Sequence, residues 1–257
     1  MCKIVSSLLV VLVLLVSSVA SADEYVVMSG VYPPFTFNKG LRVGGVSVDT
    51  IESIMKMTST PFHRKNIKLM PLKKAYADAE TLPKRVILNV PRTPEVEEKF
   101  KWVGPVYFPK YVLIGKKGNE YTIATTEDVE KYQVGSIRGS DPLDTLIEEG
   151  VDPKKVKMHT SYVQPLLELK GKKTDLIAYS NLETAYLMRQ MRIDPRKYKV
   201  AFVYKKVPLY FAFSKDTDDA KIKLYNDALA SIKVPMAHGD TVFQKNLRKY
   251  VPYGEIK

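Results

Sequence analysis

The 257-residue sequence has one cysteine, Cys2, which lies before the first apolar run. A single thiol cannot form an internal disulfide, and a lipid anchor would need a cysteine after such a run. Histidine is nearly as scarce, because His63, His159 and His238 lie far apart and in no paired spacing. Zinc sites draw on cysteine and on closely spaced histidine, so we expect no metal site and no cofactor.

Long apolar runs are also missing. The run from Leu8 to Val16 covers nine residues, whereas a membrane-spanning helix needs roughly 20. A basic start at Lys3 precedes this run, and the small residues Ala20-Ser21-Ala22 follow it. This order is typical of a secretory signal, so we predict a signal peptide over residues 1–22, cleavage before Asp23 and an exported mature chain.

Motifs of the common enzyme classes are absent from the sequence. There is no glycine-serine-glycine nucleophile elbow, no glycine-rich phosphate loop ending in Lys-Ser or Lys-Thr, and no helix with paired histidines. Carboxylates are plentiful, but a sequence does not reveal which of them converge. We therefore predict a protein without catalytic residues.

Positive charge is in excess, with 40 Lys and Arg against 28 Asp and Glu and a formal net charge of +12. The chain also has 45% hydrophobic residues. This composition is too apolar for a disordered tail and too charged for a multi-span membrane protein. The charge allows attraction to anionic envelope surfaces, an anionic ligand, or nucleic acid. Basic residues are dispersed among acids, so we expect solvated faces and no nucleic-acid partner. Adjacent basic pairs occur at Lys73-Lys74, Lys116-Lys117, Lys154-Lys155, Lys172-Lys173 and Lys205-Lys206.

Hydrophobic periodicity alternates between that of strands and that of helices along the mature chain. Such an alternation predicts an α/β fold with largely parallel sheets, and its two rounds suggest two lobes without a flexible tether. The strands are expected at 25–28, near 69, and at 86–90, 111–114, 133–137, 156–159, 174–180, 200–204 and 209–213. The helices are expected at 48–55, 72–80, after 140, and at 162–170, 181–191, 219–233 and 241–250.

An aromatic loop follows the first strand and carries Tyr32, Phe35 and Phe37. Ligands collect at the carboxyl ends of parallel strands. These rings could therefore stack on an organic solute, or they could close the core of the lobe.

Two further loops carry polar side chains. Arg138-Gly139-Ser140 opens a helix, so a guanidinium, a hydroxyl and free N–H groups converge there; this favours an anion site, with an ordinary capped helix as the alternative. Asn89, Arg92 and Thr93 end a strand between two prolines. They could present hydrogen-bonding groups to a small polar molecule or form a plain strand exit.

Several segments, taken together and in order, resemble the periplasmic solute-binding proteins of the polar amino-acid uptake family, family 3 of the ABC transporter substrate-binding proteins. They span nearly the whole mature chain, and the ordered set carries the resemblance. The segments are Tyr32-Pro33-Pro34-Phe35, Gly45-Val46-Ser47-Val48-Asp49, Arg92-Thr93-Pro94-Glu95, residues 99–107, residues 134–140 and residues 174–180.

This resemblance implies a type II periplasmic binding-protein clamp, in which two crossover strands near 111–116 and 207–213 join the lobes. Lobe one would be residues 23–113 and 210–257, and lobe two residues 114–209. A solute between the lobes would favour the closed form. The closed form of this monomeric periplasmic protein would then dock on a membrane permease.

The family's ligand residues carry over only in part. Val96 stands where amino-acid binders have a carboxylate-binding arginine, and Ser180 stands where they have an ammonium-binding aspartate. A zwitterionic amino acid is therefore disfavoured, and we expect a small polar or anionic organic solute. Tyr179, Ser180 and Asn181 are expected lobe-two contacts by position.

Two other functions use the same fold. The chain could be a sensor or envelope partner that binds a ligand without transporting it. It could also be an exported dehydratase, which would require a carboxylic acid in the cleft; Glu183, at the start of a helix, is the nearest candidate.

Overall fold

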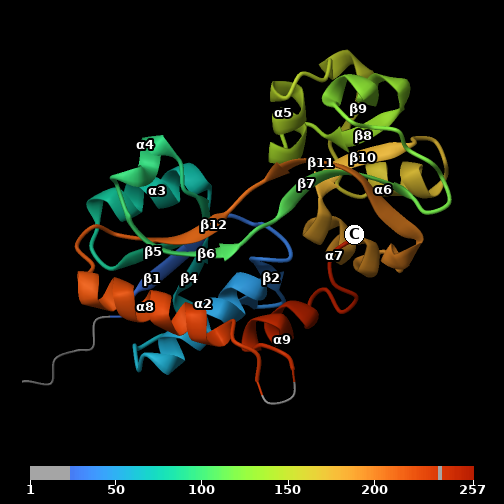
Figure 1. The fold of residues 1–257 in the computed structure, drawn as a ribbon. Helices are drawn as coiled ribbons and strands as arrows, with labels where there is room; N and C mark the ends of the chain where they lie inside the picture. The colour runs from blue at the N-terminus through green and yellow to red at the C-terminus, as the bar shows by residue number, and fades with distance from the viewer. Residues whose placement is uncertain (1–23, 237–238) are drawn as a thin grey trace, which may run out of the picture.

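The structure, a computed structural model, describes residues 24–236 and 239–257. Two lobes lie side by side, each built on a five-stranded sheet (Figure 1). The two-lobed α/β fold predicted from the sequence is confirmed. The predicted signal peptide lies outside the described residues.

The first sheet has the strand order β4-β1-β5-β12-β6. Its strands β4, β1 and β5 are parallel, whereas β12 runs antiparallel between β5 and β6. The bounds are β1 Val26–Ser29, β4 Ile67–Leu69, β5 Arg85–Pro91, β6 Lys101–Tyr107 and β12 Leu209–Phe213. The strand nearest the C-terminus in the sequence is thus a central strand of this sheet.

Helices and a hairpin complete the first lobe. Helix α2 buries Val48, Ile51, Ile54 and Met55 at the spacing of a one-sided helix, as the periodicity predicts. The aromatic loop continues into a short hairpin of β2 and β3, which is not among the strands expected from the sequence. The bounds are β2 Phe37–Lys39, β3 Arg42–Gly44, α2 Val46–Met57, η1 Arg64–Asn66, α3 Leu72–Thr81, α4 Pro94–Glu97, α8 Asp219–Ile232 and α9 Val242–Arg248.

The second sheet has the order β11-β7-β10-β8-β9. Strands β10, β8 and β9 are parallel, and β7 pairs antiparallel with both β10 and β11. The strand bounds are β7 Lys110–Lys116, β8 Val134–Ile137, β9 Val156–His159, β10 Leu176–Ser180 and β11 Tyr198–Lys206. The helix bounds are η2 Thr126–Lys131, α5 Asp141–Glu148, η3 Pro153–Lys155, α6 Gln164–Lys170, α7 Asn181–Gln190 and η4 Pro195–Lys197.

Two adjacent crossings join the lobes. One is residues 108–109, between β6 and β7, and the other is residues 207–208, between β11 and β12. Val207 N donates a hydrogen bond of 2.9 Å to Pro109 O, so the crossings lie side by side. Residues 111–116, where the first crossing is expected, lie in β7 of the second sheet, so the chain leaves the first lobe earlier, after β6. Residues 207–208 lie within the range expected for the second crossing, 207–213.

The C-terminal segment, residues 249–257, makes a third link, and we name it the C-terminal strap. It leaves α9 in the first lobe and runs to the second, where Val200 N donates a 3.0 Å hydrogen bond to Lys257 O. Glu255 accepts hydrogen bonds from Lys110 Nζ and Asn181 Nδ2, and Ile256 is buried. No pattern in the sequence indicates this link.

Among residues 24–236 and 239–257, no helix has the length and apolar character needed to cross a bilayer.

Candidate functional site

A cavity of about 650 Å³ lies in the cleft between the lobes. Its first-lobe wall comes from the end of β1, the following loop, α3 and the end of β5, and α5 forms the opposite wall. Strands β7 and β11 contribute side chains next to the crossings. Among the residues that the sequence selects as ligand contacts, Tyr32 and Asn89 line this cavity.

A line of polar groups connects the two walls of the cleft. Tyr32 belongs to the first lobe, and its hydroxyl interacts with that of Tyr111 on β7, so that each group affects the pKa of the other. Tyr111 in turn interacts electrostatically with Asp141, the first residue of α5, and both residues line the cavity. Burial raises the pKa of both tyrosines, so each remains a neutral hydroxyl that can donate and accept.

The pKa of the Asp141 carboxyl group is also shifted. Partial desolvation of the carboxyl group and the neighbouring charge of Asp144 raise its pKa, and the interaction with Tyr111 opposes that rise. Asp144 and Glu148 line the same cavity, and Lys205 is the lysine in the lining. The wall formed by α5 is therefore acidic.

Glu183 occupies the first turn of α7 and is 7% exposed. Burial, together with the charge of Asp141, raises its pKa to about 8. The carboxyl group is therefore mostly protonated at neutral pH and can donate a hydrogen bond. Glu183 also contributes to the raised pKa values of Tyr32 and Tyr111, so its titration is coupled to groups of the cleft.

Asn89 has every polar atom of its side chain engaged. Its Oδ1 accepts from Ser47 Oγ, and its Nδ2 donates to Ser29 Oγ and Thr36 Oγ1, each at 3.2 Å. The backbone at Asn89 has φ 62°, a left-handed conformation that asparagine tolerates better than most residues. Asn89 thus holds the loop of Tyr32 against α2 and the end of β5.

The other two aromatic residues of the loop pack inside the protein. Phe35 is fully buried, with its ring centroid 4.8 Å from that of Tyr107. Phe37 contacts Tyr186 of α7 and Tyr250 of the C-terminal strap, at centroid distances of 5.3 Å and 5.7 Å. Of the three aromatic residues, Tyr32 is therefore the one placed in the cleft lining.

Arg92 and Thr93 lie outside the cavity lining. Arg92 forms an exposed ion pair with Glu97, and its guanidinium lies 5.5 Å and 5.7 Å from the ring centroids of Trp102 and Tyr210. Thr93 precedes α4 as its N-cap residue. Both side chains therefore interact within the first lobe and not with the cavity.

The loop before α5 carries Arg138 and Ser140. The Arg138 side chain is exposed, while its backbone N–H donates to His159 O at 2.9 Å. Ser140 is the N-cap residue, but its hydroxyl donates back to Ile137 O at 2.8 Å. The following first turn contributes the carboxylate-bearing residues Asp141 and Asp144 to the cavity, which works against an anion at this helix end.

The residues expected in lobe two lie behind the cleft. Tyr179 is buried and its hydroxyl donates to Tyr162 O at 3.0 Å. Ser180 is fully buried, and its Oγ has no hydrogen-bond partner within the described residues. Asn181 Oδ1 accepts from Lys110 N at 3.1 Å, so this side chain joins a crossing to the C-terminal strap.

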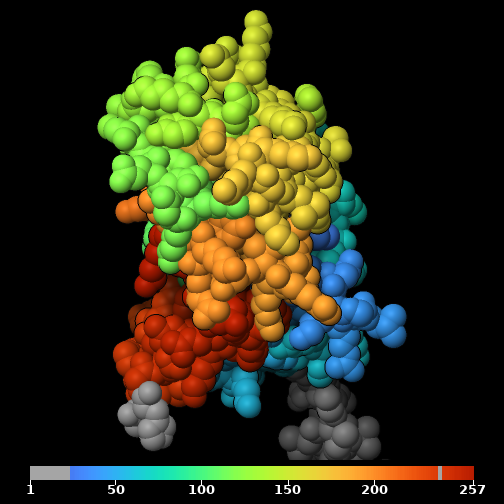
Figure 2. Space-filling view, turned by 90° about the vertical axis from the view of Figure 1, so that its right-hand side faces the viewer, coloured from blue at the N-terminus to red at the C-terminus, as the bar shows by residue number. Residues whose placement is uncertain are grey.

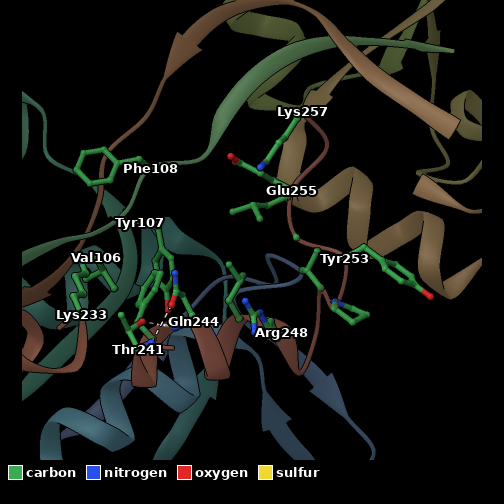
Figure 3. A pocket seen from close by; sticks show the side chains of 16 residues that line it. Val106, Tyr107, Phe108, Lys233, Thr241, Gln244, Arg248, Tyr253, Glu255 and Lys257 are labelled. Atoms are coloured by element: carbon green, nitrogen blue, oxygen red, sulfur yellow. Dashed lines mark hydrogen bonds between the residues drawn. The ribbon is translucent and has the colours of Figure 1, made fainter. Parts of the chain in front are cut away.

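A second cavity, of about 810 Å³, lies between the end of β6, α9 and the C-terminal strap (Figure 3). It shares no lining residue with the cleft cavity and contains none of the expected ligand contacts. Lys233 reaches its edge, donates to Pro105 O at 2.8 Å and lies 5.4 Å from the ring centroid of Phe243. The cleft cavity is therefore the candidate functional site.

In the part of the chain that the structure describes, no three histidine, cysteine, aspartate or glutamate side chains are grouped to hold a metal ion.

The sequence reasoning missed Tyr111 and the acidic role of Asp141 in this site. In the sequence, Tyr111 falls in the strand expected at 111–114, and Asp141 falls at the start of the helix expected after residue 140. Both become cleft residues because β7 follows a crossing and α5 begins opposite the loop of Tyr32. No local signal reports such a juxtaposition.

No protein-family model matches the sequence, and the comparison with curated proteins also finds no match. Solved structures do match. A second substrate-binding domain from Streptococcus pneumoniae, assigned to an amino acid ABC transporter, has a TM-score of 0.67 and 22% identity, covering 89% of this chain and 100% of that one. Substrate-binding domain 2 of Lactococcus lactis GlnP, in an open conformation, has a TM-score of 0.67 and 19% identity, covering 90% and 96%.

A sensor domain has a similar architecture. A histidine kinase sensor domain with similarity to periplasmic binding proteins matches with a TM-score of 0.62 and 14% identity, covering 91% of this chain and 97% of that domain. The chain therefore has the two-lobed fold of periplasmic solute-binding proteins.

Proposed function

We propose that the protein is an exported, periplasmic solute-binding protein that captures a small polar organic solute between its lobes and delivers it to an ABC-type membrane permease. The observation that carries this proposal is the cleft itself. Its cavity of about 650 Å³ is within the size range of small-molecule sites, and its polar groups come from both lobes. The similar solved structures, which are binding proteins and binding domains, support the same function.

The line from Tyr32 through Tyr111 to Asp141 explains how a solute would favour closure. A solute that hydrogen-bonds to Tyr32 and Asp141 touches both lobes at once, and it makes both bonds only when the lobes are close. Binding therefore stabilises the closed form by as much as the solute's affinity for that form exceeds its affinity for the open one. No bond in the solute needs to change for this cycle.

The charge of the cleft narrows the proposed solute class. Because Ser180 stands where amino-acid binders have an aspartate, the sequence is compatible with either a polar or an anionic solute. In the fold, Asp141, Asp144 and Glu148 line the cavity against a single lysine, Lys205. We therefore favour a polar solute rich in hydrogen-bond donors, neutral or carrying an amine, over an anion.

A sensory role is the second candidate, because a histidine kinase sensor domain shares the fold. In that role the closed form would signal to an envelope partner, and no solute would cross the membrane. The two roles predict the same binding and differ in uptake. Loss of solute uptake from cells lacking the protein supports delivery, whereas normal uptake with an altered transcriptional response supports sensing.

The direct test of binding is native mass spectrometry of the purified protein for retained solute, followed by a thermal-shift screen of polyols, amides, amines, amino acids and carboxylates. A solute at 100 times its dissociation constant should stabilise the protein by about 2.7 kcal/mol. Asp141→Asn should weaken this stabilisation. If no compound in the screen stabilises the protein, solute capture is not its function; a solute recovered in altered form would favour the dehydratase alternative.

A further inference from the structure

The fold collects positive charge at one end of the second lobe. Lys116 and Lys117 stand at the end of β7, Lys170 ends α6, and Arg192, Arg196 and Lys197 lie in and beside η4. We name these six residues the basic hollow. They come from three separate parts of the sequence, which is why the sequence shows only dispersed pairs. Figure 2 shows this side of the second lobe, where the green, yellow and orange segments meet.

The surface is concave at this point. All six residues line one cavity of about 770 Å³, together with Ile193, Asp194 and Tyr198. A smaller cavity of about 240 Å³ shares Lys117 and Arg196 with it and is also lined by Lys257 and by one acid, Glu255. A concave surface places several cations around one bound molecule, which a flat or convex surface cannot do.

In the larger of these two cavities, few negative charges balance the positive charge of the basic hollow. Asp194 is the single acid in the lining, and it is occupied by Arg196, with Nε–Oδ1 and Nη2–Oδ2 distances of 2.9 Å and 3.0 Å. Within the described residues, none of the other five cations has a carboxylate within ion-pair distance. Lys116 Nζ has a neutral acceptor instead, Lys170 O, at 2.7 Å.

The chemistry of these side chains points to one kind of guest. Five unpaired cations around one cavity repel each other, and an anion with two or more charges removes that repulsion most effectively. Phosphate groups combine multiple negative charge with several acceptor oxygens, and arginine and lysine together are their usual protein ligands. A monocarboxylate would compensate only one of the five cations.

We propose that the basic hollow is a second binding site, which takes a phosphate-bearing anion. It shares no lining residue with the cleft cavity, so it is independent of the solute site. The phosphates can come from a soluble polyphosphate or from the headgroups of anionic phospholipid. Both sources present the same chemistry, and two probes distinguish them.

The probes are sodium tripolyphosphate, followed by isothermal titration calorimetry, and phosphatidylcholine vesicles with or without phosphatidylglycerol, followed by co-sedimentation. Binding of tripolyphosphate with one-to-one stoichiometry supports a soluble guest. Binding only to vesicles that contain phosphatidylglycerol supports a headgroup. In both cases, binding should weaken as salt is added, because the contacts are between charges.

The test variant is Lys117→Gln/Arg192→Gln/Lys197→Gln. These side chains are exposed and have no carboxylate partner in the described chain, so the fold is preserved. The matched control is Lys68→Gln/Lys73→Gln/Lys221→Gln, which removes the same charge from exposed sites on the first lobe. We expect the test variant to bind at least about tenfold more weakly and the control to bind as the wild type does.

Three results would overturn the proposal. The first is the absence of binding to either probe at low salt by the wild-type protein. The second is an equal loss of binding in the test variant and the control, which would show that net charge alone explains the effect. A single-stranded DNA oligonucleotide serves as the third probe, and binding to it alone would also reject a phosphate-bearing small anion or lipid as the guest.

Discussion

The rings of Phe37 and Tyr186 lie with their centroids 5.3 Å apart, although Phe37 belongs to β2 of the first lobe and Tyr186 to α7 of the second. Phe37 also meets Tyr250, whose hydroxyl accepts a 3.2 Å hydrogen bond from Gly45 N. The lobes are therefore in aromatic contact beside the C-terminal strap. This contact is separate from the cleft, because neither ring lines the cleft cavity.

Phe37→Ala should loosen this contact. We expect the free energy of unfolding to fall by about 1 to 3 kcal/mol, since a half-buried ring and its aromatic pairing are lost. Small-angle X-ray scattering should report a larger radius of gyration. Leu41→Ala, in the same hairpin and fully exposed, is the control and should change stability by less than about 0.5 kcal/mol. An equal effect in both variants would show that the hairpin, not the ring, holds the lobes.

Glu183 should make stability depend on pH. Its pKa is about 8 in the folded protein against 4.5 in an exposed carboxyl group. Between these values the folded state holds one more proton than the unfolded state, so the free energy of unfolding falls as pH rises, by about 1.4 kcal/mol per pH unit from this group. The contribution is complete below about pH 4.5 and is lost once the pH passes 8.

Glu183→Gln keeps the shape of the side chain and removes its titration. Urea unfolding measured from pH 5 to pH 8 should therefore give a flatter profile for the variant than for the wild type. The variant should gain in relative stability toward pH 8. Parallel profiles for the two proteins would contradict a buried neutral carboxyl group at this position.

Tyr111→Phe should weaken solute binding with little effect on stability. The substitution removes a hydroxyl of the cavity lining that interacts with both Tyr32 and Asp141, and a hydrogen bond from this hydroxyl to the solute contributes about 1 to 2 kcal/mol, or roughly tenfold in affinity. Calorimetric titration with the solute found by mass spectrometry measures the change. Tyr210→Phe is the control, because Tyr210 packs beside Trp102 and outside the cleft cavity; unchanged affinity in Tyr111→Phe would remove Tyr111 from the site.

Asn89→Ala should be strongly destabilising. The substitution removes bonds to Ser29, Thr36 and Ser47 and leaves alanine at φ 62°. We expect a loss of about 2 to 4 kcal/mol in denaturant unfolding. Asn89→Gly relieves the backbone strain but does not restore the lost hydrogen bonds. Its free energy of unfolding should therefore lie between those of Asn89→Ala and the wild type. Equal stability of the two variants would mean that φ at this position costs nothing.

Much of the fold follows from local patterns. The apolar spacing of α2 and the alternation of strands with helices are enough to predict two α/β lobes, because each element buries its own apolar face. The two crossings are expected only from the family resemblance. The C-terminal strap is different. Its bonds join Glu255 to Lys110 and Asn181, residues distant in sequence, and no periodicity encodes contacts of that range.

Some residues of the candidate site could likewise be predicted from the sequence, and others could not. Tyr32 follows β1, and Asn89 lies near the end of β5, its parallel neighbour, so their meeting at one edge of the sheet follows from topology. Tyr111 and Asp141 enter the cleft through the relative placement of the two lobes, which depends on tertiary packing. The sequence likewise shows Lys116-Lys117 as one basic pair among several, and only the fold joins it to Arg192 and Lys197.

The position of β12 has a consequence for the order in which the lobes can form. All strands of the second sheet lie between residues 110 and 206, so this sheet can form as soon as that stretch of chain is available. The first sheet has a gap between β5 and β6 until residues 209–213 arrive. A chain that emerges N-terminus first can therefore complete the sheet of its second lobe before that of its first, and the edges of β5 and β6 stay unpaired until residues 209–213 arrive.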